Sequence, residues 1–173
     1  KAGADEGTLT TMCAGPDAAL DALAPVFAAT SAAVYRCGQS AGDATRVKMV
    51  NQLLTGVHLA AAAEAVALTR ALGLDSQLVY DILTRGTGNS HAFANRAHAM
   101  HAEDFSPKGM VDIFTKDLAF VEALSAQTGI DTPLARAALE KFERASALGY
   151  GRRDSAAVVK AYSPRDEDAE RGE

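Results

Sequence analysis

The sequence of 173 residues is poor in aromatic residues and has no excess of positive charge. It contains no tryptophan, only 6% aromatic residues, and 17 lysines and arginines against 22 aspartates and glutamates, which gives a net charge of −5. Nucleic-acid-binding surfaces need a basic patch, so neither nucleic acid nor an anionic membrane is an expected partner. The length fits one ordinary domain, or one domain and part of a second.

Long apolar segments are also missing. The longest, residues 59–68, is interrupted by Glu64 and is far shorter than the roughly 20 residues of a membrane helix. We therefore expect no transmembrane segment. The chain begins with Lys1 and shows no signal peptide, so it is expected to be a piece of a longer chain.

The sequence has few metal-ligating or redox residues. Cys13 and Cys37 lie in apolar segments, without a CxxC spacing or a histidine at metal-ligand spacing. This pattern predicts two small buried thiols in a reducing compartment, and hence a cytoplasmic protein. His98 and His101 are three residues apart, but the four histidines match no metal motif, so no metal site is expected.

The first 40 residues predict a strand, a helix and a second strand. Residues 8–14 favour a strand, Gly15-Pro16-Asp17 opens a helix to about residue 29, and residues 33–37 favour another strand that Gly38 ends. Two strands cannot bury the faces of a sheet by themselves. The missing strands are therefore expected upstream of Lys1.

From about residue 41 the pattern becomes helical throughout. Apolar residues recur every three or four positions for some 30 residues, which predicts one helix about 45 Å long. Its second half, residues 60–65, is apolar on nearly every side, which indicates close packing or contact with a second subunit. Further helices are expected at about 76–83, 91–101, 110–128 and 133–148, with Asp75, Ser90 and Thr132 as caps and Gly149 as a stop.

Polar residues form a stripe on the long helix. Lys48, Asn51, Gln52, Thr55 and His58 share one face, because residues three or four apart are neighbours on a helix. Such groups on an otherwise buried helix need partners, either within the protein or in a substrate. The alternative is structural: Lys48 extends to solvent at the rim, and Asn51 caps a neighbouring segment.

Two further features favour structural roles. Lys116 and Asp117 are adjacent on a helix and should point in different directions, which predicts a solvated face without a salt bridge between them. The loop Gly86-Thr-Gly88-Asn-Ser90 lacks a third glycine and follows a helix, so it is a weak dinucleotide motif. We expect a tight turn and a helix N-terminus there, whose free N–H groups could meet a carboxylate.

Taken together, several short motifs resemble the β-hydroxyacid dehydrogenase family, which includes the 3-hydroxyisobutyrate and 6-phosphogluconate dehydrogenases. The resemblance runs from about residue 6 to 161. Within it, the run from Lys48 to Ala65 is most similar to the branch acting on four-carbon sugar acids such as L-threonate. The motifs that carry it are Thr8-Leu9-Thr10, Gly38, Gly42, Lys48-Met-Val-Asn51-Gln52, Lys116-Asp117-Leu118, Gly149-Tyr-Gly151 and Asp154.

The resemblance implies a mainly α fold of the 6-phosphogluconate dehydrogenase C-terminal type, with one long helix, preceded by a β-α-β remnant of a Rossmann domain. Residues 1–40 would be that remnant, 41–162 an all-helical catalytic and dimerisation domain, and 163–173 a flexible tail. The complete enzyme would bind NAD or NADP mainly through the missing domain. It would oxidise a small hydroxy acid and form a homodimer or a larger homo-oligomer.

The resemblance also assigns roles to four residues. Lys48 matches the catalytic lysine, Asn51 and Gln52 match amides that hold the substrate, and Lys116 matches the lysine beside the nicotinamide. A lysine can take the proton of an alcohol if burial lowers its pKa from ~10.4 toward neutrality. The sequence departs from the family where Gly42-Asp-Ala replaces Gly-x-Gly and where Gln52 replaces a second asparagine.

Two functions follow from these observations. The first is the C-terminal part of an NAD(P)-dependent dehydrogenase of a small hydroxy acid, inactive without the cofactor-binding loop. The alternative is a non-catalytic helical module for dimerisation or binding. A relative that binds a modified histone or a sugar acid after losing the catalytic lysine is less favoured, because Lys48 is present.

Overall fold

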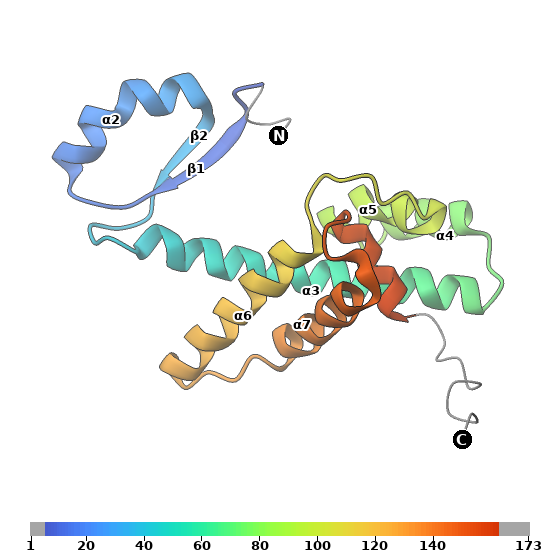
Figure 1. Cartoon of the computed structure of the whole chain (residues 1–173). Helices are drawn as coiled ribbons and strands as arrows, with labels where there is room; N and C mark the ends of the chain where they lie inside the picture. Colours follow the sequence, from blue (N-terminus) through green and yellow to red (C-terminus); the bar gives the residue numbers. More distant parts are fainter. Residues whose placement is uncertain (1–5, 163–173) are drawn as a thin grey trace. The chain divides into compact units, whose positions relative to one another are not determined.

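The computed structural model describes residues 6–162, and its elements follow the order expected from the sequence (Figure 1). The chain divides into two compact units, residues 1–52 and 53–173. The predicted boundary near residue 40 and the flexible tail at 163–173 stay predictions, and the tail lies outside the described residues.

The first unit contains a β-α-β motif. Strand β1 (Leu9–Cys13), helix α2 (Asp17–Thr30) and strand β2 (Ser31–Arg36) follow one another, and the two strands pair in parallel. Arg36 holds the helix to the second strand through ion pairs with Asp17 and Asp21. The expected β-α-β arrangement is confirmed, although β2 begins two residues before the predicted start.

The two cysteine side chains differ from the prediction. Cys13 and Cys37 are half-buried rather than buried, and both thiols donate to the Tyr35 carbonyl oxygen at 3.5 Å. They lie where the two strands end, and the Cys37 N–H donates to the Cys13 carbonyl. Within residues 6–162 the sheet contains two strands, and both thiols at its end are partly open to solvent.

Helix α3 (Asp43–Ala71) is the predicted long helix, and it continues from the first unit into the second. Within the second unit, Ala60, Ala62, Ala63 and Val66 are buried, as expected for its alanine-rich half. It is the one helix in residues 6–162 that is long and apolar enough to cross a membrane, judged by length and composition alone. A core helix of a soluble protein passes the same test, so the absence of a membrane span stays a prediction.

In its described residues, the second unit consists of helices, with one isolated β-bridge between Met110 and Asp154. Helices α4 (Ser76–Arg85), α5 (His91–Ala102), α6 (Val111–Thr128) and α7 (Pro133–Ala145) are followed by a wide π-type turn, η1 (Ser146–Tyr150), and a 3-10 helix, η2 (Ser155–Tyr162). Met100, Leu118 and Phe142 are fully buried at its centre, and the rings of Phe114 and Phe142 stack at 5.1 Å. The sequence therefore yields a mainly helical fold with a small parallel sheet.

Near the end of this unit two local predictions differ from the structure, and one helix was not predicted. Helix α7 ends at Ala145 rather than near residue 148, because the chain widens into η1, where Gly149 has a φ of +90°. Thr132 occupies the N-cap position, but its side chain makes no cap hydrogen bond and its hydroxyl is buried without a partner. Helix η2 is not indicated by the sequence pattern.

Candidate active site

The predicted polar stripe begins with a hydrogen-bonded cluster in the first unit. The Lys48 ammonium donates to the Gln52 side-chain carbonyl oxygen at 2.8 Å, and the Asn51 amide donates to the same oxygen at 3.1 Å. The spacing of four residues on α3 places Lys48 over Gln52. Gln52 is only 6% exposed, so a buried acceptor holds two more exposed donors in place.

A cavity of about 340 Å³ lies beside this cluster, within the first unit. Its lining comes from strand β1, through Thr10 and Met12, and from the first turns of α3, through Ala44, Thr45 and Lys48. The Lys48 amine therefore stands at a hollow that can admit a small molecule. In α/β folds, ligands bind beside the ends of the strands, next to loops and helix N-termini. This cavity is likewise lined by residues of one strand and of a helix N-terminus.

The environment of Lys48 differs from the one that the expected chemistry requires. A lysine that acts as a base at neutral pH needs burial, and the Lys48 side chain is exposed in the described chain. Its hydrogen bond to Gln52 fixes the direction of the amine but does not remove it from water.

Lys116 lies on α6 in the second unit, with its side chain 65% exposed. Its ammonium forms an ion pair with the Asp117 carboxylate at 3.2 Å, so the prediction that these neighbours do not pair was wrong. The flexible four-carbon stem of lysine lets the ammonium bend around the helix to an adjacent carboxylate. Asp117 itself is buried, which anchors one side of the pair.

A second cavity, of about 310 Å³, lies within the second unit. Helix α3 supplies Thr55 and His58 to its wall, and α5 supplies His91, Asn95 and Arg96. The sequence places Thr55 and His58 on the polar stripe, but it gives no role to Asn95 or Arg96. The remaining lining residues are Leu59, Ala92, Gly109, Phe114 and Ser155.

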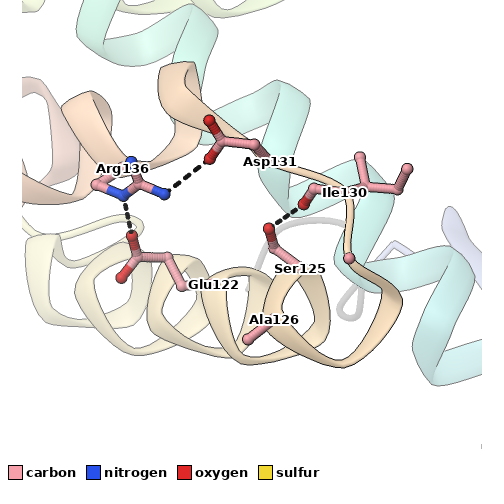
Figure 2. Close-up of a pocket in the computed structure, with 7 residues that line it drawn as sticks. Glu122, Ser125, Ala126, Ile130, Asp131 and Arg136 are labelled. Atoms are coloured by element: carbon pink, nitrogen blue, oxygen red, sulfur yellow. Dashed lines mark hydrogen bonds and ion pairs between the residues drawn. The ribbon is translucent and has the colours of Figure 1, made fainter.

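The cavity at the α6–α7 turn is larger, at about 430 Å³, but it contains none of the predicted site residues. Figure 2 shows Arg136 between Glu122 and Asp131, with ion-pair distances of 3.1 and 2.8 Å. The Ser125 hydroxyl donates to the Ile130 carbonyl across the same turn. Its charged groups thus satisfy one another and hold the turn together, so we assign this cavity a structural role.

The loop at residues 86–90 has the structure expected of a turn before a helix. The Ser90 hydroxyl accepts from the Phe93 N–H at 3.0 Å and caps α5, and the Asn89 amide donates to the Thr84 carbonyl. Asp75 caps α4 in the same way, accepting from the Leu78 N–H at 2.7 Å. Among the described residues, no group of three or more histidine, cysteine, aspartate or glutamate side chains is placed to hold a metal ion.

Comparison with known proteins defines the family. Residues 42–162 match the family model described as "NAD-binding of NADP-dependent 3-hydroxyisobutyrate dehydrogenase", and the chain belongs to this family. The family resemblance seen in the sequence is therefore confirmed. The matched region covers the whole of α3 and all the helices that follow it.

Among curated relatives, L-threonate dehydrogenase from Escherichia coli K12 is 42% identical over 160 residues, which are 92% of this chain and 53% of that protein. The L-threonate dehydrogenase of Haemophilus influenzae is also 42% identical, over 91% of this chain and 52% of its own length. The chain spans about half the length of these relatives.

Solved structures agree with the fold. The crystal structure of 3-hydroxyisobutyrate dehydrogenase from Salmonella typhimurium matches with a TM-score of 0.86 and 42% identity, over 91% of this chain and 55% of that one. A Mycobacterium tuberculosis 3-hydroxyisobutyrate dehydrogenase matches with a TM-score of 0.84 and 27% identity, over 94% of this chain and 57% of that one.

Proposed function

We propose that the chain is the C-terminal part of an NAD(P)-dependent dehydrogenase that oxidises a small hydroxy acid, with a four-carbon sugar acid such as L-threonate as substrate. The observation that carries the proposal is the cluster in which Lys48 and Asn51 share the Gln52 carbonyl oxygen beside a cavity. The 42% identity to L-threonate dehydrogenases favours this substrate class.

In this proposal Lys48 is the catalytic base. Oxidation of the alcohol removes the hydroxyl proton and transfers a hydride from the same carbon, and NAD(P)⁺, when bound, accepts that hydride. The neutral Lys48 amine takes the proton and becomes an ammonium, which Gln52 already orients by accepting one of its N–H groups. Substrate and cofactor would supply the burial that the amine lacks in the described chain.

Asn51 and Gln52 position the substrate. Their amides both donate and accept hydrogen bonds, and they do not titrate, so they can bind hydroxyl and carboxylate groups without competing for the proton. Because Gln52 is buried and Asn51 is not, we expect Asn51 to make the more direct contact with the substrate.

Lys116 fits the role of a donor to the cofactor. Its exposed ammonium pairs with Asp117 through one contact, and an ammonium has three N–H donors. The ion pair would hold the amine on the helix surface, where it can reach an amide or phosphate oxygen. The side chain that selects NAD or NADP lies in the family's other domain, so this chain leaves that choice open.

We further propose that the first unit completes a larger Rossmann sheet. Leu23, Val26 and Tyr35 are 46, 56 and 60% exposed on the β-α-β motif. Apolar surface of this size on a two-stranded sheet is expected to pack against further strands and helices. Without that domain the chain would bind the cofactor poorly and would not turn over substrate.

The second unit carries a candidate surface for a homodimer. Leu68, Leu72, Leu78 and Ile82 are each more than half exposed on α3, α4 and the turn between them. An isolated apolar patch of this kind favours self-association, and we propose that it forms the subunit contact of a soluble, cytoplasmic homodimer. We propose neither nucleic acid nor a membrane as a partner.

The proposal is tested by measuring NADH and NADPH formation by the complete gene product that contains this chain. The substrates are L-threonate, D-erythronate, D-glycerate and 3-hydroxyisobutyrate, and the 173-residue chain alone is the control. We expect turnover of a four-carbon acid by the complete product and none by the chain. Absence of turnover on all four acids would contradict the proposal.

The alternative remains a non-catalytic helical module. A cytokine-like nuclear factor N-PAC from Aedes aegypti is 32% identical over 90% of this chain and 28% of its own length, so the fold also occurs in a protein whose name is not that of an enzyme. Failure of the complete product in the assay above, together with a stable dimer of the chain, would favour this alternative.

A further inference from the structure

The second-unit cavity combines a wall of hydrogen-bond donors with an apolar wall. Helix α5 contributes Arg96, His91 and Asn95, while Leu59 and Phe114 supply apolar surface. No aspartate or glutamate is among the described residues that line it. A small cavity with a few convergent polar groups on an apolar background is the usual form of a ligand site.

Arg96 is fixed in this wall by a buried carboxylate. Its Nε lies 3.3 Å from Asp154, which is only 2% exposed, and its Nη1 donates to the Asn95 carbonyl at 3.2 Å. Asp154 also accepts from the backbone N–H groups of Gly109 and Ala156. Three donors therefore share the Asp154 carboxylate, which fixes the position of Arg96.

The Nη2 atom of the Arg96 guanidinium can still bind a ligand. Within the described residues, Nη2 of Arg96 forms neither a hydrogen bond nor an ion pair, and the side chain is 27% exposed at the cavity. Nη2 carries two N–H donors in the plane of the guanidinium. A guanidinium that is fixed through Nε and Nη1 and has Nη2 unpaired is well suited to bind a carboxylate.

Two imidazoles and a helix N-terminus add donors to the same wall. Among the described residues, neither the His58 ring nor the His91 ring has a hydrogen-bond partner, and both residues are exposed at the cavity. His91 and Ala92 form the first turn of α5, whose N–H groups have no acceptor within the helix. The positive end of the helix dipole therefore adds to the charge of Arg96.

We propose that this cavity binds the carboxylate of a small organic acid, with Arg96 and His91 as the principal contacts and Leu59 and Phe114 against its carbon atoms. The site is built entirely from the second unit. This inference rests on the proposed function only for the choice of hydroxy acids as probes, because binding of an acid requires neither cofactor nor turnover.

The test is an NMR titration of the histidine ring signals in the 173-residue chain. L-threonate and D-glycerate are compared with threitol and glycerol, their neutral counterparts, and with inorganic phosphate. We expect the acids to shift the His58 and His91 signals in a saturable way, while the neutral compounds do not. Equal effects of threitol and L-threonate, or saturation by phosphate alone, would overturn the proposal.

Variants make the assignment specific. Arg96→Gln should weaken binding of the acids at least ~10-fold, the size expected for loss of a hydrogen bond to a charged group. His91→Gln should weaken it by a smaller factor and preserves the fold, because His91 is exposed at the start of α5. Arg85→Gln, an exposed change on α4, is the control and should bind normally.

Unchanged binding in the His91→Gln and Arg96→Gln variants would overturn the proposal. The result of this binding titration does not depend on the result of the dehydrogenase assay. If the complete protein is inactive but this chain still binds the acids at Arg96, the proposed function is wrong and the proposed site is correct.

Discussion

At the residue scale, the most informative feature is how buried acceptors orient exposed donors. Gln52 holds Lys48 and Asn51, and Asp154 holds Arg96 with two backbone N–H groups. In both clusters a buried oxygen acceptor is shared by more than one donor, which fixes the direction of a longer cationic side chain. This arrangement reduces the side-chain entropy that binding would otherwise cost.

A titration prediction belongs to the same scale. Burial, with a smaller effect of the Glu64 carboxylate, raises the pKa of Tyr162 to about 12. Because this folded-state pKa lies above the unfolded value of about 10, the contribution of Tyr162 to stability is complete below pH 10 and is lost as the pH rises toward 12. The near-ultraviolet absorbance of tyrosinate should show one late ionisation, absent in Tyr162→Phe.

Glu64→Gln provides the finer check on that titration. Removing the carboxylate should move the late ionisation partway toward pH 10, since burial, the larger cause, remains. Glu140→Gln, an exposed change on α7, serves as the control and should leave the curve in place. A tyrosine titration that is complete near pH 10 would contradict the burial of this ring.

At the scale of elements, α3 and α6 come into close contact at Gly56 and Leu118. A Cβ added at Gly56 would lie 2.9 Å from the two terminal carbons of Leu118, a distance at which one of the groups must move. Leu118 is fully buried, so its side chain can give way only by moving against its neighbours in the core. Glycine at this position allows the two helices to pack at short range.

Gly56→Ala tests this contact. In an exposed helix the change would stabilise by about 0.5–1 kcal/mol, but overpacking against Leu118 should instead lower the free energy of unfolding by ~1–3 kcal/mol. Urea unfolding followed by circular dichroism measures the difference. Gly88→Ala is the control, because its added Cβ would meet the nearest atom at an ordinary 3.8 Å. A Gly56→Ala variant more stable than the parent would contradict the described packing.

Local signals predict most of these elements correctly. Asp75 and Ser90 each place a short acceptor side chain before an apolar periodic run, which is typical of an N-cap, and both make the expected hydrogen bonds. Thr132 has the same local signal but a different backbone, with ψ of 64°, which turns its hydroxyl away from the helix N–H groups. Helix η2 has no such signal, because a short segment buried on nearly every side lacks periodicity.

The clusters are harder to predict than the elements. Lys48, Asn51 and Gln52 are close in sequence, so their contact follows from helical spacing. Arg96 and Asp154 lie far apart in the sequence, and no local pattern indicates that they meet. The prediction that Lys116 does not pair with its neighbour Asp117 rests on backbone direction alone, which ignores the reach of a long side chain.

At the scale of the whole molecule, the family match covers most of this chain but only part of its relatives. The chain belongs to the 3-hydroxyisobutyrate dehydrogenase family and spans about half the length of curated relatives such as the L-threonate dehydrogenases. Its described residues contain a lysine–amide cluster and a helical unit but no glycine-rich dinucleotide loop. The proposed enzyme therefore needs a domain beyond these residues.

The most direct test of the proposed function is the effect of Lys48→Ala on hydroxy-acid oxidation by the complete gene product. Loss of a general base should reduce kcat by roughly 10²- to 10⁴-fold, with a smaller change in KM. Arg46→Ala, an exposed cation two residues earlier, is the matched control and should retain activity. Turnover by Lys48→Ala equal to that of the parent would contradict the assignment of Lys48 as the catalytic base.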